Sequence, residues 1–151
     1  MAAGAAIAAV PSRLTWQGAA PRAQSAGVEA LADEDALHLK VDGRKVFDFL
    51  LRAKPPSPSI KSAFLRAGYM HPVFTPSGRI VTDDYPDDHY HQHGVFFAWT
   101  KTEFEVRHPD FWNMGDGTGA VVFDKIDNVR SGPTRASFNA YRSEEHTSEL
   151  Q

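Results

Sequence analysis

The dipeptide Asp42-Gly43, placed between two short alternating segments, constrains the fold of this chain more than any other feature. A two-residue β-hairpin turn needs positive φ at both central positions, and Asp-Gly adopts it easily. Apolar and polar residues alternate over 37–41, and a second strand-like segment covers 45–50. We therefore predict a hairpin here. Alternation places the following side chains on one of its faces: Leu37, Leu39 and Val41.

Turns and short strand-like segments continue along the rest of the chain, which has 10 Pro and 11 Gly. Between residues 27 and 141 no segment repeats its apolar residues with the period of a helix. Further strands are expected at 63–69, 79–82, 95–99, 120–126 and 134–141, with a β-turn at 75–78 and a Pro-rich loop at 53–59. We predict an all-β, antiparallel β-sandwich, of which a supersandwich is one form. The apolar run 95–99 reads as a buried strand, with Phe97 and Trp99 in the core.

Composition excludes several classes of protein. The chain has 16 basic and 19 acidic residues, so bulk charge does not make it a nucleic-acid binder. It has no Cys, which excludes disulfide scaffolds, thiol nucleophiles and Cys-ligated zinc. Its apolar runs are shorter than about 18 residues, so we expect no membrane-spanning helix.

Both ends are expected to lie outside the fold. Residues 1–26 are Ala-rich, and Ala23-Gln24-Ser25 resembles a signal-peptide cleavage site, although no basic residue precedes the apolar run at 2–10. This segment is either a signal peptide whose start lies upstream or a disordered leader. We expect a periplasmic or secreted protein, with the cytoplasm as the alternative. Residues 142–151, RSEEHTSELQ, resemble the in-frame translation of a sequencing adapter, so we expect the natural sequence to stop being visible near Tyr141.

A histidine row is the most distinctive chemical feature. His89, His91 and His93 follow one another at every second position within the polar segment 83–93. In an extended backbone such residues share a face, about 6.5–7 Å apart. The imidazoles could then bind a divalent metal, bind substrate hydroxyls, or act as general acid and base. The alternative is a solvated polar turn without a function.

Other residues complete the candidate site. His71, which precedes Pro72 in a different segment, could supply a further imidazole, or could be structural. The carboxylates of Asp83, Asp84 and Asp88 could orient the imidazoles, or could be ordinary turn residues. Trp112 lies in a loop where an aromatic ring could stack on a sugar face, or simply pack. The candidate ligand-binding residues are Tyr85, Asp88 and Trp112, beside the candidate catalytic residues His71, His89, His91 and His93.

These motifs resemble those of the bacterial PmoA-like family, whose members are usually labelled methane oxygenase PmoA or a domain of unknown function. The shared elements are Tyr69-x-His71-Pro72, the turn Thr75-Pro76-Ser77-Gly78, Pro86-x-Asp88-His89, the His-rich stretch before Gly94, and Phe111-Trp112. Similarity covers roughly residues 28–141 and is specific over 67–112. Family members are about twice as long, so the resemblance implies that 27–141 is the N-terminal part of the domain.

The resemblance implies a β-sandwich protein, often exported, linked to carbohydrate catabolism. It does not imply a true methane monooxygenase subunit, because that is a multi-span membrane protein and this sequence has no spanning segment. The leading hypothesis is a carbohydrate-related enzyme that uses the His cluster, with a small-molecule or carbohydrate ligand and a divalent metal as a possible cofactor. The alternative is a non-catalytic carbohydrate-binding module. Whether the protein is an enzyme stays open on the sequence alone.

Overall fold

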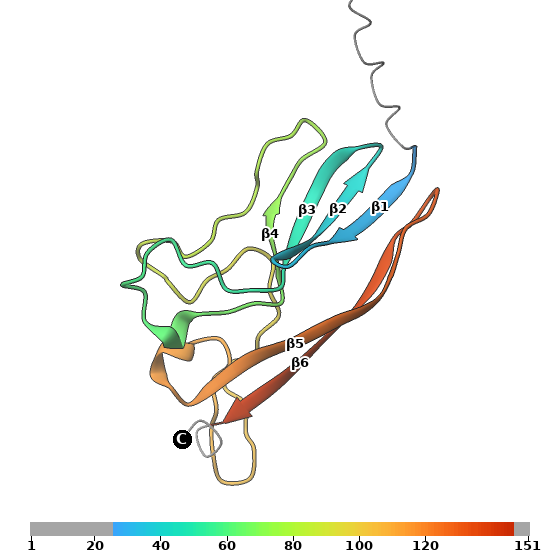
Figure 1. Cartoon of the computed structure of the whole chain (residues 1–151). Helices are drawn as coiled ribbons and strands as arrows, with labels where there is room; N and C mark the ends of the chain where they lie inside the picture. Colours follow the sequence, from blue (N-terminus) through green and yellow to red (C-terminus); the bar gives the residue numbers. More distant parts are fainter. Residues whose placement is uncertain (1–25, 147–151) are drawn as a thin grey trace, which may run out of the picture.

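The structure, a computed structural model, describes residues 26–146, so all but the last residue of the expected leader lies outside it. The described residues form two antiparallel sheets and two short 3-10 turns, without an α-helix (Figure 1). The first sheet has the order β1-β2-β3-β4 and the second is the hairpin β5-β6. Their bounds are β1 Val28–Ala32, β2 Ala36–Val41, β3 Arg44–Leu50, β4 Tyr69–Val73, β5 Gly119–Arg130 and β6 Ser137–His146, with η1 at Ser62–Phe64 and η2 at Met114–Asp116. The predicted all-β, antiparallel fold is confirmed.

The β2-β3 hairpin forms at the predicted turn. Asp42 and Gly43 have φ of 49° and 75°, the left-handed conformation that this turn requires. Next to the turn Lys40 pairs with Lys45, but a bulge then shifts the register, so that His38 pairs with Asp48. The shift decides which side chains face each other across the outer surface of the sheet.

The core lies between the two sheets. Leu37 and Phe49 on the first sheet are buried against Phe123 and Phe138 of the β5-β6 hairpin. The Phe49 ring meets the Phe138 ring edge-on at 5.1 Å and the Phe123 ring at 6.0 Å. The hairpin therefore covers one face of the sheet as a second layer (Figure 1). Leu39 packs on the same core, as predicted, while Val41 is exposed beside the turn.

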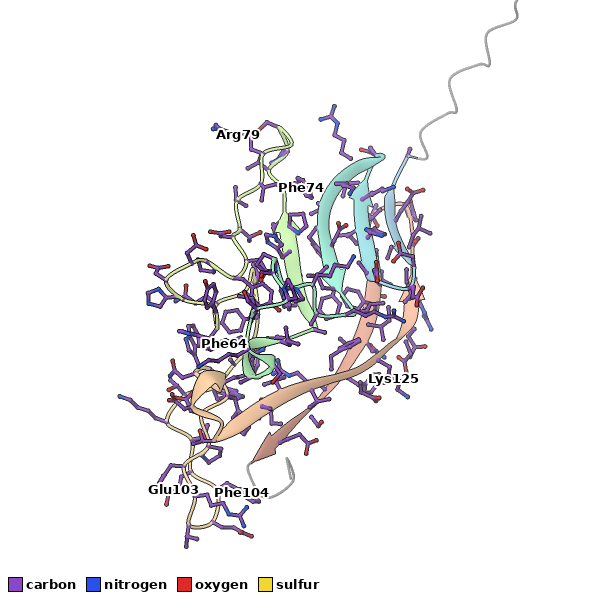
Figure 2. The ribbon with its side chains drawn as sticks, turned by 60° about the vertical axis from the view of Figure 1, so that its left-hand side comes forward. Phe64, Phe74, Arg79, Glu103, Phe104 and Lys125 are labelled. Atoms are coloured by element: carbon purple, nitrogen blue, oxygen red, sulfur yellow. The ribbon has the colours of Figure 1, made fainter. Side chains whose placement is uncertain are left out.

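Several expected strands take another form. The segment predicted as a strand over 63–69 instead begins with η1, and β4 starts only at Tyr69. Over 79–82 a single bridge joins Ile80 to Phe74, although the turn between them forms as predicted, with the Gly78 N–H donating to the Thr75 oxygen. Figure 2 shows Arg79 at the outer end of the loop that contains this turn.

The run 95–99 is not a buried strand, and the prediction for its core residues is wrong. Only Val95 forms a bridge, with Met70, and the side chains of Phe97 and Trp99 are half-exposed. The alternation itself is present, but the inward-facing member of the run is Phe96, which packs against a buried cluster of Ala36, Leu50 and Tyr69. The apolar run thus lies on the surface of the molecule with one face turned inward.

No helix among the described residues is long and apolar enough to cross a membrane. Residues 142–146, which we expect to be foreign, continue β6 and pair with β5 as far as Gly119. Their foreign origin stays a prediction, and no part of the site below depends on them.

Candidate functional site

The histidine-rich segment forms a compact loop that is closed at its base. Asp84 and His93 form a β-bridge, and the Tyr85 N–H donates to the Gln92 oxygen at 3.1 Å. Between them lie two successive turns, in which the N–H of His89 donates to Pro86 and the N–H of Gln92 donates to His89. The prediction that His89, His91 and His93 lie in an extended strand is therefore wrong. Pro and Asp at the start of the loop favour turns instead.

His93 is the buried member of the row, with 2% of its surface exposed. Its Nδ1 lies 2.9 Å from Oδ1 of Asp84, and the Tyr69 hydroxyl donates to Oδ2 of the same carboxylate at 2.7 Å. Burial, together with the negative charge of Asp84, raises the pKa of Tyr69 far above its ordinary value, so this hydroxyl stays a donor. The rings of Tyr85 and Phe96 pack against the imidazole. Asp84 is thus held from two sides.

His89 and His91 lie apart from this buried centre. Their rings meet edge-on at 5.7 Å, and Nδ1 of His89 lies 3.1 Å from Asp88 in a solvent-exposed position. Partial burial, and then the charges of His89 and His93, lower the pKa of His91. Within residues 26–146 no three His, Asp or Glu side chains are placed to hold one metal ion. A metal ion bound by His89, His91 and His93 therefore stays a hypothesis, which the arrangement of the described side chains does not support.

His71 on β4 reaches the same region from another strand. Its Nδ1 lies 3.0 Å from Oγ1 of Thr82, which already accepts a hydrogen bond from the Val73 N–H. The Thr82 hydroxyl can therefore donate its proton to Nδ1, which leaves Nε2 of the neutral ring as the protonated nitrogen. Nε2 has no partner among the described residues and is available to a ligand.

A cleft of about 360 Å³ brings these groups together. It is lined by Asp48, Leu50, Lys54, Pro56, His71, Pro72, Asp84 and Tyr85. Of the predicted site residues, His71 and Tyr85 line it directly, and His93 holds one of its carboxylates from behind. The remaining four are not among its lining residues: His89, His91, Asp88 and Trp112.

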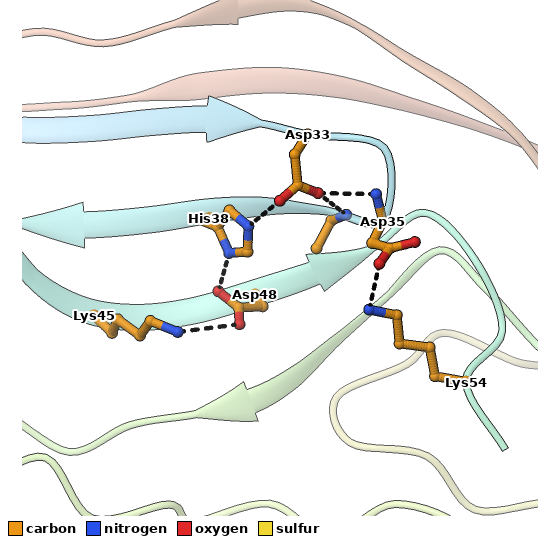
Figure 3. A network of polar contacts seen from close by, with 7 residues as sticks. Asp33, Asp35, His38, Lys45, Asp48 and Lys54 are labelled. Atoms are coloured by element: carbon orange, nitrogen blue, oxygen red, sulfur yellow. Dashed lines mark hydrogen bonds and ion pairs between the residues drawn. The ribbon is translucent and has the colours of Figure 1, made fainter. Parts of the chain in front are cut away.

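A second His–Asp pair holds the other carboxylate of the cleft. His38 lies between two carboxylates, with Nδ1 2.6 Å from Asp48 and Nε2 3.0 Å from Asp33 (Figure 3). Hydrogen bonds, first to Asp33 and then to Asp48, raise the pKa of His38. Both nitrogens donate only in the imidazolium form, so this geometry favours a charged His38. Lys45 approaches the outer oxygen of Asp48 at 3.8 Å.

The sequence matches a family of unknown function, DUF6807, over residues 36–144. This chain belongs to the DUF6807 family. The matched segment contains every residue that lines the cleft, together with His38 and His93. No curated protein and no solved structure shows a significant match.

Three groups of this DUF6807 site were missed by sequence reasoning: Asp48, His38 and Lys54. Asp48 and His38 come together only through the bulge in the β2-β3 hairpin, for which the sequence carries no clear signal. Lys54 lies in the Pro-rich loop, where an ion pair with Asp35 at 2.8 Å holds it beside the sheet. Asp84 was expected either to orient the imidazoles or to be an ordinary turn residue, and the structure makes it a lining residue.

Next to the cleft, the DUF6807 segment holds a buried arginine without a carboxylate partner among the described residues. Nη2 of Arg66 donates to the Phe111 oxygen at 2.7 Å, and the guanidinium stacks on Phe96. Burial lowers the pKa of Arg66 to about 10. Four buried polar atoms have no partner in the described part of the chain: Nε and Nη1 of Arg66, Oη of Tyr85 and Nε2 of His93. This polar centre has unmet hydrogen-bonding capacity.

Trp112 occupies a separate part of the surface. Its ring is partly exposed and rests on Phe96 at 5.0 Å. Oδ1 of Asp110 accepts hydrogen bonds from the backbone N–H groups of Trp112 and Asn113, which fixes the loop. Phe111 is buried, so Trp112 is the accessible ring of the Phe111-Trp112 pair. Figure 2 shows the neighbouring loop reaching away from the sheets as far as Glu103 and Phe104.

Proposed function

We propose that this DUF6807 protein is a carbohydrate-related enzyme whose active site is the cleft between β3, β4 and the base of the histidine loop. One observation carries the proposal. The carboxylates of two separate His–Asp pairs, Asp48 and Asp84, line the same cleft as His71. Titratable groups that converge on one cleft, each held by its own partner, are typical of sites that bind and transform a polar ligand.

Each group has a role that its geometry allows. Nε2 of His71 can donate to a sugar hydroxyl, or can exchange a proton with it as general acid or base. The carboxylates of Asp48 and Asp84 keep free lone pairs that accept hydrogen bonds from hydroxyls. The cleft volume falls in the range of small-molecule sites, which suits a ligand of monosaccharide size.

The resemblance to the PmoA-like family supports carbohydrate catabolism as the setting, and it remains part of this proposal. The leader-like residues 1–26 are the basis on which we propose a periplasmic or secreted location. The assignment of the cleft as the active site depends on neither the resemblance nor the leader-like residues.

Ligand-observed NMR on the full chain tests the proposal, with aldoses and their glycosides as probes and the appearance of product signals as the measure of turnover. His71→Ala is expected to abolish turnover and to weaken binding only several-fold. His89→Ala, which lies outside the cleft, is the matched control and is expected to retain both. Absence of binding by every sugar, or equal losses in the two variants, would contradict an active site at this cleft.

A carbohydrate-binding module is the second candidate, favoured by the partly exposed ring of Trp112 resting on Phe96. Aromatic rings of this kind stack on sugar faces. Under this alternative, Trp112→Ala removes binding, His71→Ala leaves it unchanged, and no sugar is converted.

A further inference from the structure

The lining of the cleft carries more negative than positive charge. It holds two carboxylates, Asp48 and Asp84, and one ammonium, that of Lys54. The Lys54 ammonium is already paired with Asp35, 2.8 Å away and outside the lining. The carboxylate of Asp48 is likewise paired, with His38 and Lys45. When these partners and Asp33, which His38 also contacts, are counted, four carboxylates face three cations, so a ligand still meets an excess of negative charge.

Both carboxylates are fixed in place. Asp84 accepts from the Tyr69 hydroxyl and contacts the fully buried imidazole of His93. Asp48 contacts His38, and its side chain is 12% exposed. Neither side chain can swing away from a ligand without breaking these contacts.

We propose that this cleft selects uncharged and amino sugars and rejects sugars that carry a carboxylate or a phosphate. The inference rests on the proposed function, because it names the substrate class of that same site. Ionised carboxylates accept hydrogen bonds from hydroxyl or ammonium groups, whereas an anionic ligand gains no donor from them and is repelled. Discrimination by placing like charge against the unwanted ligand is a common means of specificity.

Titration calorimetry on the full chain tests this, with matched sets of D-glucose, D-glucosamine and D-glucuronate and the corresponding galactose set. Within whichever set binds, the uronate is expected to bind at least tenfold more weakly than the neutral sugar. The amino sugar is expected to bind at least as tightly as the neutral one. Added salt should reduce the difference in affinity between the uronate and the neutral sugar, because it screens the repulsion between the uronate and the cleft carboxylates.

A charge-removing variant locates the effect. Asp48→Asn removes one lining charge at constant shape and is expected to reduce the discrimination against the uronate several-fold. Asp42→Asn, at the exposed hairpin turn, makes the same change in net charge away from the cleft and should leave the discrimination unchanged.

The outcomes separate the two proposals. Uronates that bind as tightly as neutral sugars would overturn this inference and leave the proposed function standing. Discrimination that survives Asp48→Asn unchanged would overturn the assignment to the cleft carboxylates. If no sugar of any class binds, the proposed function fails and this inference fails with it.

Discussion

His93 and His89 lie four positions apart in one loop, yet their surroundings differ completely. The imidazole of His93 is enclosed by aromatic rings and contacts a carboxylate that is itself mostly buried. The imidazole of His89 is half-exposed beside an exposed Asp88. Burial therefore decides what each ring contributes, because a buried hydrogen-bonding group is costly to leave unpaired while a solvated one is not.

We expect His93→Ala to lower the free energy of unfolding by about 3 kcal/mol, since it opens a cavity and removes a buried partner of Asp84. His89→Ala in the same loop should change it by less than about 0.5 kcal/mol, as is usual for an exposed residue. Urea denaturation followed by tryptophan fluorescence measures both. Similar losses of stability in the two variants would show that the buried His93 contributes no more to stability than the exposed His89.

His38 should make stability depend on pH. The pKa of His38 is raised in the folded state. Its contribution to folding stability is therefore complete below its pKa in the unfolded chain, about 6.5, and is lost as the pH rises through the pKa of the folded state. The hydrogen bond from His38 lowers the pKa of Asp33, so that contribution is present above about pH 4 and is lost on acidification. The cluster is therefore most stabilising between about pH 4 and 6.5.

The expected result is that the urea midpoint of the natural chain falls between pH 6 and pH 9 more than that of His38→Gln. The contact of His38 with Asp33 is exposed and that with Asp48 is partly buried, so we expect a small difference between the two proteins. Parallel pH profiles for the two proteins would show that His38 does not carry the dependence.

At the scale of elements, sequence could predict what local turn chemistry determines. The β2-β3 hairpin, the 75–78 turn and the β5-β6 strands follow from Asp-Gly, Pro and alternation, each of which acts over a few residues. The cleft could not be predicted in this way. Without the bulge His38 would pair with Phe47 rather than Asp48, and one residue of register changes which side chain meets the imidazole.

The contact between β4 and the segment after the histidine loop depends on the absence of a side chain at Gly94. A Cβ at this position would lie 2.1 Å from the Met70 oxygen and 2.8 Å from Cβ of His71. Backbone cannot yield as a side chain can, so the bridge between Met70 and Val95 would have to break.

We expect Gly94→Ala to destabilise the protein by about 3 kcal/mol or more, the range of changes that disrupt packed backbone. Gly78→Asn is the control, because nothing lies within 4 Å of a Cβ there and Asn tolerates positive φ. Thermal unfolding followed by circular dichroism compares them. A Gly94→Ala protein as stable as the control would show that this contact is not tight.

At the scale of the whole molecule, two layers depend on a small shared core. Phe49 is the residue of the first sheet whose ring meets two rings of the β5-β6 hairpin. Many other large apolar side chains are exposed, Val106 most of all. Layer packing therefore depends on a few aromatic contacts rather than on a broad apolar interface.

Phe49→Ala should cost about 3–5 kcal/mol, the usual loss for a buried phenylalanine, and Val106→Ala should cost almost nothing. A double-mutant cycle with Phe138→Ala should give a coupling energy of about 0.5–1.5 kcal/mol, as expected for an edge-on ring pair. Strictly additive losses would mean that the two sheets do not pack through these rings.

The closure of the histidine loop at its base has one further consequence. Asp84 and His93 are joined to each other and to β4, whereas the tip from Pro86 to Gln92 is held by its own turns and by the contact of the Tyr90 ring with Phe64. A relative could lengthen, shorten or recompose that tip and keep the centre beneath it intact. Sequence differences between such proteins would then be concentrated at the tip. The exposed surface of the loop could therefore change faster than the buried centre beneath it.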